Sequence, residues 1–284
     1  MKICIIGHGF VGKALHRALK NNVEIEIIDP KYKTDLSLID IFKPNIVFIC
    51  APTPMSNDGT QDITILNSIL DDLDKLKQKF ITVIKSTVLP DHSKDISTLR
   101  PNIVFNPEFL REAHADYDFI HSNLIVFGSH NKKKSQQVAD FYKNHTKCKS
   151  KEYIFLDPIS SSFVKYTINS FLALKVTFFN EINSLFNSSG TNCSWKDFTD
   201  ILQKDVRMGT SHMDVPGHDG RKGYGGACLP KDTYAFVKYS NEIQKPLSLL
   251  KKGISINNNI RKEYTTKLTR EIDQNIDFSG EKID

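Results

Sequence analysis

Long apolar runs are absent from this chain of 284 residues. A membrane-spanning helix requires about 18 or more consecutive apolar residues, and the apolar start at residues 1–6 meets a glycine too early to serve as a secretion signal. The five cysteines are scattered, and none forms a C-x-x-C pair. This pattern argues against a disulfide framework and against a zinc site. We therefore expect a cytoplasmic protein with reduced thiols, no bound metal and no membrane partner.

A strong charge imbalance is also missing, because 38 Lys and Arg residues stand against 33 Asp and Glu residues, a net charge of +5. Basic runs at residues 132–134 and 147–151 lack the interleaved aromatic residues of a nucleic-acid surface. We interpret them as solvated surface and expect no nucleic-acid partner. The mild positive balance also suits an anionic small substrate. The composition, 39% hydrophobic and 25% charged, is typical of a globular protein of one or two domains.

Short apolar segments alternate with helical patterns through the first half of the chain. This alternation predicts βαβ units around a mostly parallel sheet. We therefore predict a doubly wound, Rossmann-like α/β domain over residues 1–156. Helical patterns cover residues 11–19 and 63–76, and the predicted strands are residues 2–6, 24–28, 45–49, 81–85, 102–105, 123–127 and 153–156.

The strand pattern ends at Asp157, and residues 157–284 are predicted to form a helical domain. Asp157 and Pro158 are typical of an N-cap followed by a proline in the first turn, opening a helix that extends to about Asn187. Residues 246–276 carry apolar side chains at four-residue spacing, which predicts one further helix of about 46 Å. A surface helix and a dimerisation helix are both compatible with that length.

A glycine-rich turn, G-H-G-F-V-G, occupies residues 7–12 between the first predicted strand and the first helix. In this setting the glycines let the backbone approach a pyrophosphate, and the helix N-terminus attracts the phosphates. Asp29 ends the second predicted strand, where a carboxylate would bind the adenine ribose of NAD; Lys31 and Lys33 nearby leave NADP as an alternative. The predicted cofactor-binding residues here are Gly7, Gly9, Phe10, Val11, Gly12 and Asp29.

Three further loops follow the third, fourth and fifth predicted strands, at residues 51–54, 86–87 and 106–108. Ligands of open parallel sheets bind beyond the carboxyl ends of the strands. We therefore expect these loops to meet at one crevice, although their prolines are equally compatible with ordinary tight turns.

Lys165 and Asn169 lie four residues apart in the helix predicted from Pro158. They therefore share a face, and a lysine beside an amide can stabilise an oxyanion. A lysine whose ammonium group reaches solvent is the alternative interpretation.

The sequence G-Y-G-G-A-C-L-P-K-D at residues 223–232 places Cys228 just before a helix that Pro230 is predicted to open. A helix N-terminus and the nearby Lys231 would favour the thiolate, which is the nucleophilic form. Asp232, one turn further, is positioned to act as a base or to hold a water molecule. A buried, inert cysteine is the alternative.

Six motifs occur in order along nearly the whole chain: GHGFVG, APTP, KSTV, NPEFLRE, VKYTINSFLALKV and GYGGACLPKD. This series resembles the UDP-glucose/GDP-mannose dehydrogenase family, cytosolic enzymes that oxidise the primary alcohol of a nucleotide sugar to a carboxylate with two NAD. The resemblance implies that Cys228 is the nucleophile, that Lys165 and Asn169 support the oxyanion, that Asp232 and Thr87 hold the catalytic water, and that Glu108 takes part in acid–base steps.

The resemblance also implies contacts with the two ligands. Beyond the glycine-rich turn and Asp29, the cofactor contacts are Pro52, Thr53, Thr87 and Lys231. The substrate contacts are Glu108, Phe109, Leu110, Arg111, Glu112, Lys165, Asn169, Tyr224, Gly225 and Gly226. Arg221 is a further candidate, because it lies in a basic stretch, residues 212–222, that is suited to contact a diphosphate. An exposed surface loop is the alternative interpretation of that stretch.

The family pairs subunits through a long central helix, which makes a homodimer the expected assembly, with residues 246–276 as the candidate helix. Family members usually carry a third, nucleotide-closing domain, and this chain stops about where that domain would start. A separate UDP-binding chain is therefore a possible partner. Two other functions stay open: a two-electron β-hydroxyacid dehydrogenase that uses Lys165 and Asn169, and a non-catalytic NAD-binding subunit. UDP-glucose 6-dehydrogenation is the leading prediction.

Overall fold

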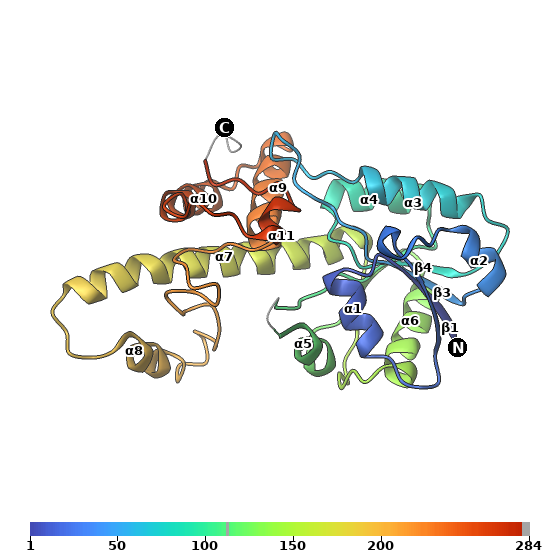
Figure 1. Cartoon of the computed structure of the whole chain (residues 1–284), viewed down its shortest axis with the longest axis horizontal. Helices are drawn as coiled ribbons and strands as arrows, with labels where there is room; N and C mark the ends of the chain where they lie inside the picture. The colour runs from blue at the N-terminus through green and yellow to red at the C-terminus, as the bar shows by residue number, and fades with distance from the viewer. Residues whose placement is uncertain (112–113, 280–284) are drawn as a thin grey trace. The chain divides into compact units, whose positions relative to one another are not determined.

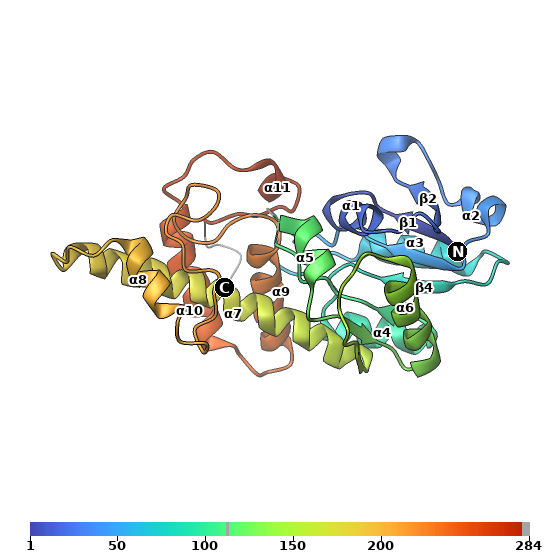
Figure 2. The same cartoon turned by 90° about the horizontal axis from the view of Figure 1, so that it is seen from below.

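The computed structural model describes residues 1–111 and 114–279 of the chain (Figures 1 and 2). The chain separates into two compact units. The first contains residues 1–53 and 62–165, and the second contains Pro54–Gln61 together with the chain from Tyr166 onward. The division falls inside a single helix, between Lys165 and Tyr166.

The first unit alternates strands and helices, as the sequence predicts. Its strands are β1 (Lys2–Ile6), β2 (Glu24–Ile28), β3 (Ile46–Ile49), β4 (Ile81–Ile84), β5 (Val104–Phe105), β6 (Val126–Gly128) and β7 (Ile154–Leu156). Its helices are α1 (Phe10–Arg17), the 3-10 turn η1 (Pro30–Tyr32), α2 (Ser37–Phe42), α3 (Thr64–Asp74), α4 (Pro90–Leu99), α5 (Ala115–His121) and α6 (Lys132–His145).

The seven strands form one sheet in the order β2-β1-β3-β4-β5-β6-β7. All neighbouring strands pair in parallel except β5 and β6, which meet antiparallel at Phe105 and Gly128. The order reverses on either side of β1, so the carboxyl ends of β1 and β3 flank the switch point at which such sheets bind ligands. The doubly wound, mostly parallel sheet predicted from the sequence is confirmed.

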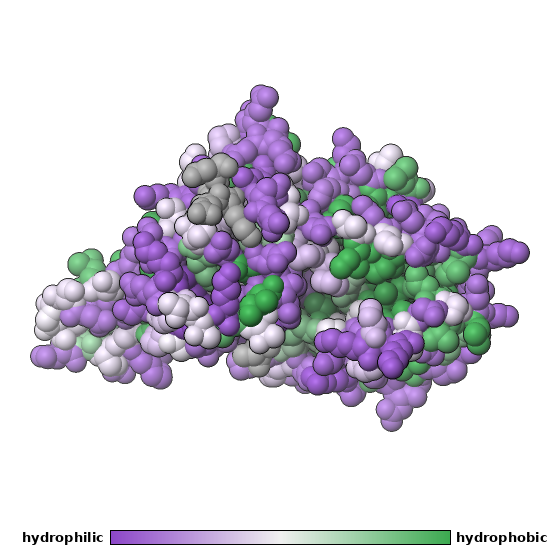
Figure 3. Space-filling view, turned by 45° about the horizontal axis from the view of Figure 1, so that its top comes forward, coloured by the Kyte–Doolittle hydropathy of each residue, from purple (hydrophilic) through white to green (hydrophobic). Residues whose placement is uncertain are grey.

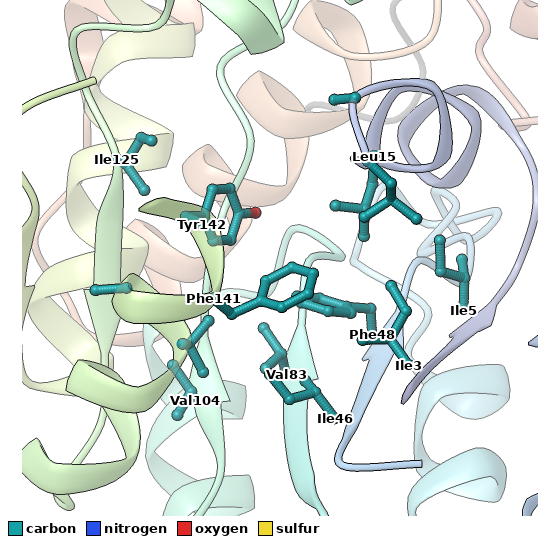
Figure 4. Packing of buried hydrophobic residues seen from close by; sticks show 14 of the residues in the cluster. Ile3, Ile5, Leu15, Ile46, Phe48, Val83, Val104, Ile125, Phe141 and Tyr142 are labelled. Atoms are coloured by element: carbon teal, nitrogen blue, oxygen red, sulfur yellow. The ribbon is translucent and has the colours of Figure 1, made fainter. Parts of the chain in front are cut away.

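Both faces of this sheet are covered, because successive residues of a strand point to opposite sides. Ile3 and Ile5 face α1, α5 and α6, whereas Cys4 and Ile6 face α2, α3 and α4. On the first face the ring of Phe141 in α6 packs 5.3 Å from the ring of Phe48 in β3, as Figure 4 shows. Two buried cores thus hold the carboxyl ends of the strands in fixed positions.

The second unit is helical, as predicted. The 31-residue helix α7 (Pro158–Ser188) begins in the first unit and continues through the second, close to the predicted bounds. It is followed by α8 (Trp195–Leu202), α9 (Leu229–Glu242), α10 (Ser248–Arg261) and the single turn α11 (Thr269–Ile272).

The prediction of one continuous helix over residues 246–276 is wrong. Helix α10 ends at Arg261, and the chain turns back so that the Arg261 guanidinium lies 2.8 Å from the Glu271 carboxylate. In an unbroken helix these residues would be about 15 Å apart along the axis. The ion pair can form only if the helix is broken between the two residues. The four-residue apolar spacing carries no information about that pair.

Helix α7 carries the exposed apolar stripe of the second unit. Phe171, Phe178 and Leu185 recur every seven residues and are 63, 53 and 68% exposed. Positions seven apart lie on one face of a helix, so the three side chains form a single stripe. We call these residues the α7 stripe.

The face drawn in Figure 3 carries a broad patch of hydrophobic residues over the first unit, whereas hydrophilic residues predominate over the second. Across residues 1–111 and 114–279, no helix combines the length and the apolar character needed to cross a bilayer.

Candidate functional site

The glycine-rich turn connects β1 to α1, as predicted. Gly7 adopts a φ of +90°, and a Cβ there would lie 2.7 Å from the carbonyl oxygen of Cys50. A Cβ on Gly12 would lie 2.1 Å from the carbonyl oxygen of Gly7. Both positions therefore require glycine for the fold itself.

Gly9 differs from the other two glycines of the turn. It is the N-cap of α1, and a Cβ there would meet no atom within 4 Å. The backbone is thus open to a ligand beside a helix N-terminus, where the positive end of the helix dipole favours a phosphate. Phe10 and Val11 form the first turn of α1 beside it. This cradle fits the pyrophosphate of NAD.

The carboxylate of Asp29 lies beside the turn at the end of β2 and is buried. Its Oδ2 accepts a 2.6 Å hydrogen bond from the backbone N–H of His8, and its Oδ1 accepts one of 2.9 Å from Lys31 N. Each oxygen of an ionised carboxylate keeps a second lone pair. Asp29 is therefore oriented by the turn and still able to accept ribose hydroxyls.

The rings of His8, His16 and Tyr32 form a chain of contacts beside the glycine-rich turn. Nδ1 of His8 is 2.8 Å from the Tyr32 hydroxyl, and its Nε2 is 3.0 Å from Nδ1 of His16. Burial, followed by the positive charges of His16 and Lys13, lowers the pKa of His8. The lowered pKa favours the uncharged imidazole of His8, in which one ring nitrogen donates and the other accepts.

The loops after β3 and β4 are joined by side-chain hydrogen bonds. Thr53 Oγ1 donates to the Thr87 carbonyl at 2.9 Å, and Ser86 Oγ donates to the Ala51 carbonyl at 2.6 Å. Two of the three loops that were expected to converge are thus joined within the first unit, and Pro52 lies between the two joined residues of its own loop.

Lys85 is a buried residue for which sequence analysis proposed no role. Its Nζ donates to Asn106 Oδ1 and contacts the Tyr142 hydroxyl, each at 3.0 Å, and burial lowers its pKa. Asn106 Nδ2 in turn donates to the Val126 carbonyl at 2.9 Å. Its sequence signals were its place directly after β4 and at the start of the KSTV motif. This network fixes the start of the loop that carries Glu108.

Glu108 and Lys165 form a buried pair within the first unit. Lys165 Nζ donates to the Glu108 carbonyl at 2.6 Å and lies 3.5 Å from its Oε1. Glu108 Oε2 accepts a 2.6 Å hydrogen bond from Leu110 N, and the Lys165 ammonium lies 5.4 Å from the centre of the Phe109 ring. Two predicted site residues from distant parts of the sequence are thereby brought into contact.

The predicted substrate contact Arg111 has a different partner. Arg111 is exposed, and its guanidinium forms a 2.7 Å ion pair with Asp118. Its charge is therefore already engaged by a neighbouring carboxylate. Glu112 lies outside the described residues.

Cys228 is the N-cap of α9, and Pro230 lies in the first turn of that helix, as the sequence predicts. It is partly buried and forms no disulfide with the other described cysteines. Burial raises the pKa of the Cys4 and Cys50 thiols to about 12, so both stay protonated at neutral pH. Among these three thiols, Cys228 alone has a helix N-terminus beside it, which favours a thiolate.

Asp232 lies one turn along α9, with its backbone N–H donating to the Cys228 carbonyl at 3.0 Å. Its buried carboxylate is held on both sides, by Lys231 Nζ at 2.5 Å from Oδ1 and by Asn169 Nδ2 at 2.6 Å from Oδ2. Lys231, predicted to contact the cofactor, is thus ion-paired to its neighbour. Asn169 holds the carboxylate rather than standing free.

The glycine-rich loop before Cys228 is held by its backbone. Tyr224 is buried, and Asn257 bonds to its backbone through Oδ1 at 2.7 Å and Nδ2 at 3.0 Å. A Cβ on Gly225 would lie 2.1 Å from Arg261 Nη2, and Gly226 adopts a φ of +74°. Tyr224 therefore anchors the loop with its ring in the core.

Arg221 lies in a turn closed by a 2.9 Å hydrogen bond from Gly217 N to the Arg221 carbonyl. Its guanidinium packs 5.3 Å from the centre of the Tyr264 ring. Asp219 and Arg261 support this turn, and neither belongs to a motif that would have predicted such a role. Among the described residues, no cluster of three or more His, Cys, Asp or Glu side chains is arranged to hold a metal ion.

A doubly wound sheet with an open glycine cradle and an oriented carboxylate at the switch point defines a dinucleotide-binding protein of the dehydrogenase type. Two family models match the chain: the NAD binding domain of the UDP-glucose/GDP-mannose dehydrogenase family over residues 31–146, and the central domain of the same family over residues 160–259. The chain therefore belongs to the UDP-glucose/GDP-mannose dehydrogenase family, a family of oxidoreductases, and NAD is the cofactor of its first unit.

Curated relatives agree with this assignment. A UDP-glucose 6-dehydrogenase of Campylobacter jejuni is 30% identical over 97% of this chain and 76% of its own length. A UDP-glucose 6-dehydrogenase of Rickettsia felis is 30% identical over 84% of this chain and 52% of its own length. The chain thus corresponds to between half and three quarters of these relatives.

Solved structures show the same fold. A UDP-glucose dehydrogenase from Pyrobaculum islandicum superposes with a TM-score of 0.73 at 22% identity, covering 92% of this chain and 68% of that one. A 3-hydroxyisobutyrate dehydrogenase from Mycobacterium tuberculosis superposes with a TM-score of 0.69 at 13% identity, covering 99 and 97%. At these identities the likeness concerns the fold alone.

Proposed function

We propose that this protein is a nucleotide-sugar 6-dehydrogenase that oxidises UDP-glucose to UDP-glucuronate in two NAD-dependent steps. The observation that carries the proposal is the arrangement around Cys228: a thiol at a helix N-terminus, with a buried carboxylate one turn further on that Lys231 and Asn169 hold in place. A two-electron alcohol dehydrogenase has no need of such a thiol.

The chemistry follows from the demand for four electrons. When bound, NAD accepts one hydride from the substrate carbon in each oxidation. The alcohol first becomes an aldehyde, and the Cys228 thiol adds to it to give a thiohemiacetal. Loss of a second hydride and a proton gives a thioester. Water then cleaves the carbon–sulfur bond, releasing the carboxylic acid and the free thiol.

Other residues support the steps between these states. Lys165 and Asn169 stabilise negative charge on the substrate oxygen. The Asp232 carboxylate and the loop at Thr87 hold the hydrolytic water, and Glu108 exchanges protons. These roles follow the family resemblance, and the buried contacts of Lys165 with Glu108 and of Asn169 with Asp232 are compatible with them.

NADH formation by the purified chain tests the proposal, measured with UDP-glucose, GDP-mannose and UDP-N-acetylmannosamine and counted per sugar consumed. Two NADH per UDP-glucose support the proposal. One NADH per substrate identifies a two-electron dehydrogenase instead. No reduction of NAD with any sugar, together with normal NAD binding, favours a subunit that completes a partner chain.

Cys228→Ser separates the thiol from the rest of the site. We expect NAD binding to be retained and acid formation to be lost, because a serine hydroxyl is far less nucleophilic than a thiolate at neutral pH. Exposed Cys193 provides the matched control, and Cys193→Ser should keep full turnover. Acid formation by Cys228→Ser would rule out the thioester route.

We also propose that two copies of the chain associate through the α7 stripe. The family resemblance implies subunit pairing through a long central helix, and α7 is the 31-residue helix of this chain. Phe171, Phe178 and Leu185 present an exposed apolar seam that a second copy would cover. This helix replaces residues 246–276 as the candidate dimerisation element.

A further inference from the structure

Arg261 is a buried charge at the end of α10, with its side chain 1% exposed. Nη1 lies 2.8 Å from Asp219 Oδ2, and Nη2 lies 2.8 Å from Glu271 Oε1, which is equally buried. Breaking such a pair is strongly destabilising, yet apolar side chains often fill the same volume as well or better. Stability alone therefore does not account for these ion pairs, and the positions that they give to neighbouring segments are relevant.

We call each carboxylate bound to Arg261 an arm of this network. The Glu271 arm contacts the loop before Cys228, residues 223–228. Glu271 Oε1 accepts a 3.1 Å hydrogen bond from Gly226 N, two residues before Cys228. The Arg261 guanidinium lies where a side chain on Gly225 would be, since a Cβ there would be 2.1 Å from Nη2. The loop therefore follows the surface of the ion pair, and moving either charged group moves the segment that ends in Cys228.

The Asp219 arm reaches the turn that carries Arg221. Asp219 Oδ1 accepts a 3.0 Å hydrogen bond from Arg221 N, while its Oδ2 binds Arg261. The guanidinium groups of Arg221 and Arg261 both pack against the Tyr264 ring, at 5.3 and 5.7 Å from its centre. The same guanidinium thus orders two loops through two different carboxylates.

We propose that Arg261 is a positioning residue that couples the Arg221 turn to the Cys228 loop, with Asp219 and Glu271 as its two arms. The inference rests on the proposed function, in which Cys228 attacks the substrate, and on the predicted contact of Arg221 with the substrate diphosphate. The Glu271 arm sets the reactivity of the thiol, and the Asp219 arm sets the affinity for the anionic part of the substrate. Loss of Arg261 affects both.

Three substitutions separate the two arms. Glu271→Gln replaces one carboxylate oxygen with an NH2 group, which cannot accept a hydrogen bond. At the position of Oε1 that group would face the donors of Arg261 and Gly226, and at the position of Oε2 it would face Leu268 N. Asp219→Asn does the same opposite Arg221 N or Arg261. Arg261→Lys keeps the charge but loses the two-pronged geometry. Glu263→Gln, at an exposed position of the same segment, removes the same charge and serves as the control.

Steady-state NADH formation and amide hydrogen exchange are measured on each full-length variant. For Glu271→Gln we expect kcat to fall about tenfold or more with little change in KM, because a displaced nucleophile reacts slowly. For Asp219→Asn we expect KM for the nucleotide sugar to rise about tenfold with little change in kcat. Arg261→Lys should show both effects, and Glu263→Gln neither.

Hydrogen exchange provides a readout that does not depend on turnover. It should become faster in residues 223–228 for Glu271→Gln, in residues 217–222 for Asp219→Asn, and in both for Arg261→Lys. Faster exchange with unchanged kcat and KM would overturn the positioning role. Exchange that stays at the wild-type rate in all three variants would overturn the coupling itself.

The two proposals can fail separately. If the wild-type chain forms no NADH with any nucleotide sugar, the proposed function fails, and the exchange pattern alone decides whether Arg261 couples the loops. If the wild type is active, the division between kcat and KM decides the inference. Should a variant unfold, as its thermal midpoint would reveal, the remaining two still distinguish the arms.

Discussion

The side-chain amide of Asn169 donates a hydrogen bond of 2.6 Å to Oδ2 of Asp232, joining α7 to α9 across 63 residues of sequence. With Lys231 on the other oxygen, the carboxylate has an ionic partner and a neutral one, both in a buried setting. Hydrogen bonds to a charged group are the strong ones, and such a carboxylate has a fixed direction. An aspartate held in this way can orient a water molecule without moving.

Replacing Asp232 with Asn should destabilise the fold and slow turnover. The change leaves the buried Lys231 ammonium without its charge partner, which costs about 3–5 kcal/mol. Loss of a base that positions water lowers kcat by about 10²–10⁴-fold. Urea unfolding and NADH formation measure the two effects.

The control for this prediction is an exposed Lys–Asp pair. Lys196 and Asp200 form an ion pair with side chains 80 and 49% exposed, and such pairs contribute about 1 kcal/mol or less. Asp200→Asn should therefore unfold almost as the wild type does. Equal urea midpoints for the two variants would contradict the role given to the buried carboxylate.

Gly9→Ala should weaken NAD binding while leaving the fold intact. A methyl group there meets no protein atom within 4 Å, so we expect a stability change within about 0.5 kcal/mol. It would occupy the space through which the backbone approaches the pyrophosphate, and we expect the dissociation constant of NAD to rise about tenfold or more. Calorimetric titration measures the affinity for NAD, and thermal melting measures the stability of the fold.

Gly12→Ala provides the opposite case. The added methyl would lie 2.1 Å from the Gly7 carbonyl oxygen, and overpacking of this kind costs about 1–3 kcal/mol. The melting temperature itself should fall. If Gly9→Ala bound NAD like the wild type, the cradle would lie elsewhere.

The stability of the protein should fall in mild acid because of His8. Burial, His16 and Lys13 lower its pKa from the ordinary value of 6.5, whereas Asp29 acts in the opposite direction. The unfolded chain then binds a proton that the folded chain excludes. This contribution to stability is present above about pH 6.5 and is lost as the pH falls below that value.

Urea midpoints from about pH 7.5 to about pH 5.5 measure this effect. His8→Gln should lose less stability over that range than the wild type, because the titrating group is gone. His218→Gln, at an exposed position, should keep the wild-type dependence. An unchanged pH dependence in His8→Gln would assign the loss to other groups.

Phe178→Asp should convert the proposed dimer into a monomer. A carboxylate in the middle of the α7 stripe would be buried without a partner on association, which is strongly unfavourable. Light scattering after size exclusion should then give the mass of one chain. Val206→Asp, at a position 91% exposed outside α7, should leave the wild-type mass unchanged. A wild-type chain that is already monomeric would refute the dimer directly.

The sequence predicted the first unit in detail because its signals are local. Most strands are short, largely apolar runs, and the glycine-rich turn is required by close contacts at Gly7 and Gly12. Predicted strand bounds differ from the observed ones by a few residues at most. The antiparallel pairing of β5 with β6 had no such signal, since strand direction depends on the path of the connecting chain.

The second unit was predicted less well because long-range ion pairs determine part of its shape. Arg261 and Glu271 read as ordinary surface residues, yet they break the predicted helix and support the Cys228 loop. The motif residues Lys165, Asn169 and Asp232 were found, but which of the predicted site residues contact one another was not. Which carboxylate or carbonyl a buried lysine contacts depends on packing between distant segments, and periodicity carries no information about that.

Pro54–Gln61 belongs to the second unit although the rest of that unit begins at Tyr166. The Gln61 amide donates to the Tyr166 hydroxyl at 3.0 Å, and the backbone N–H of the buried Met55 donates to the Gln274 carbonyl at 3.3 Å. At ribosomal speed Met55 is made roughly 10 to 40 s before Gln274. The second unit therefore cannot complete this contact until Gln274 has been made, and a contiguous fragment starting at Tyr166 would lack an internal piece of its own core.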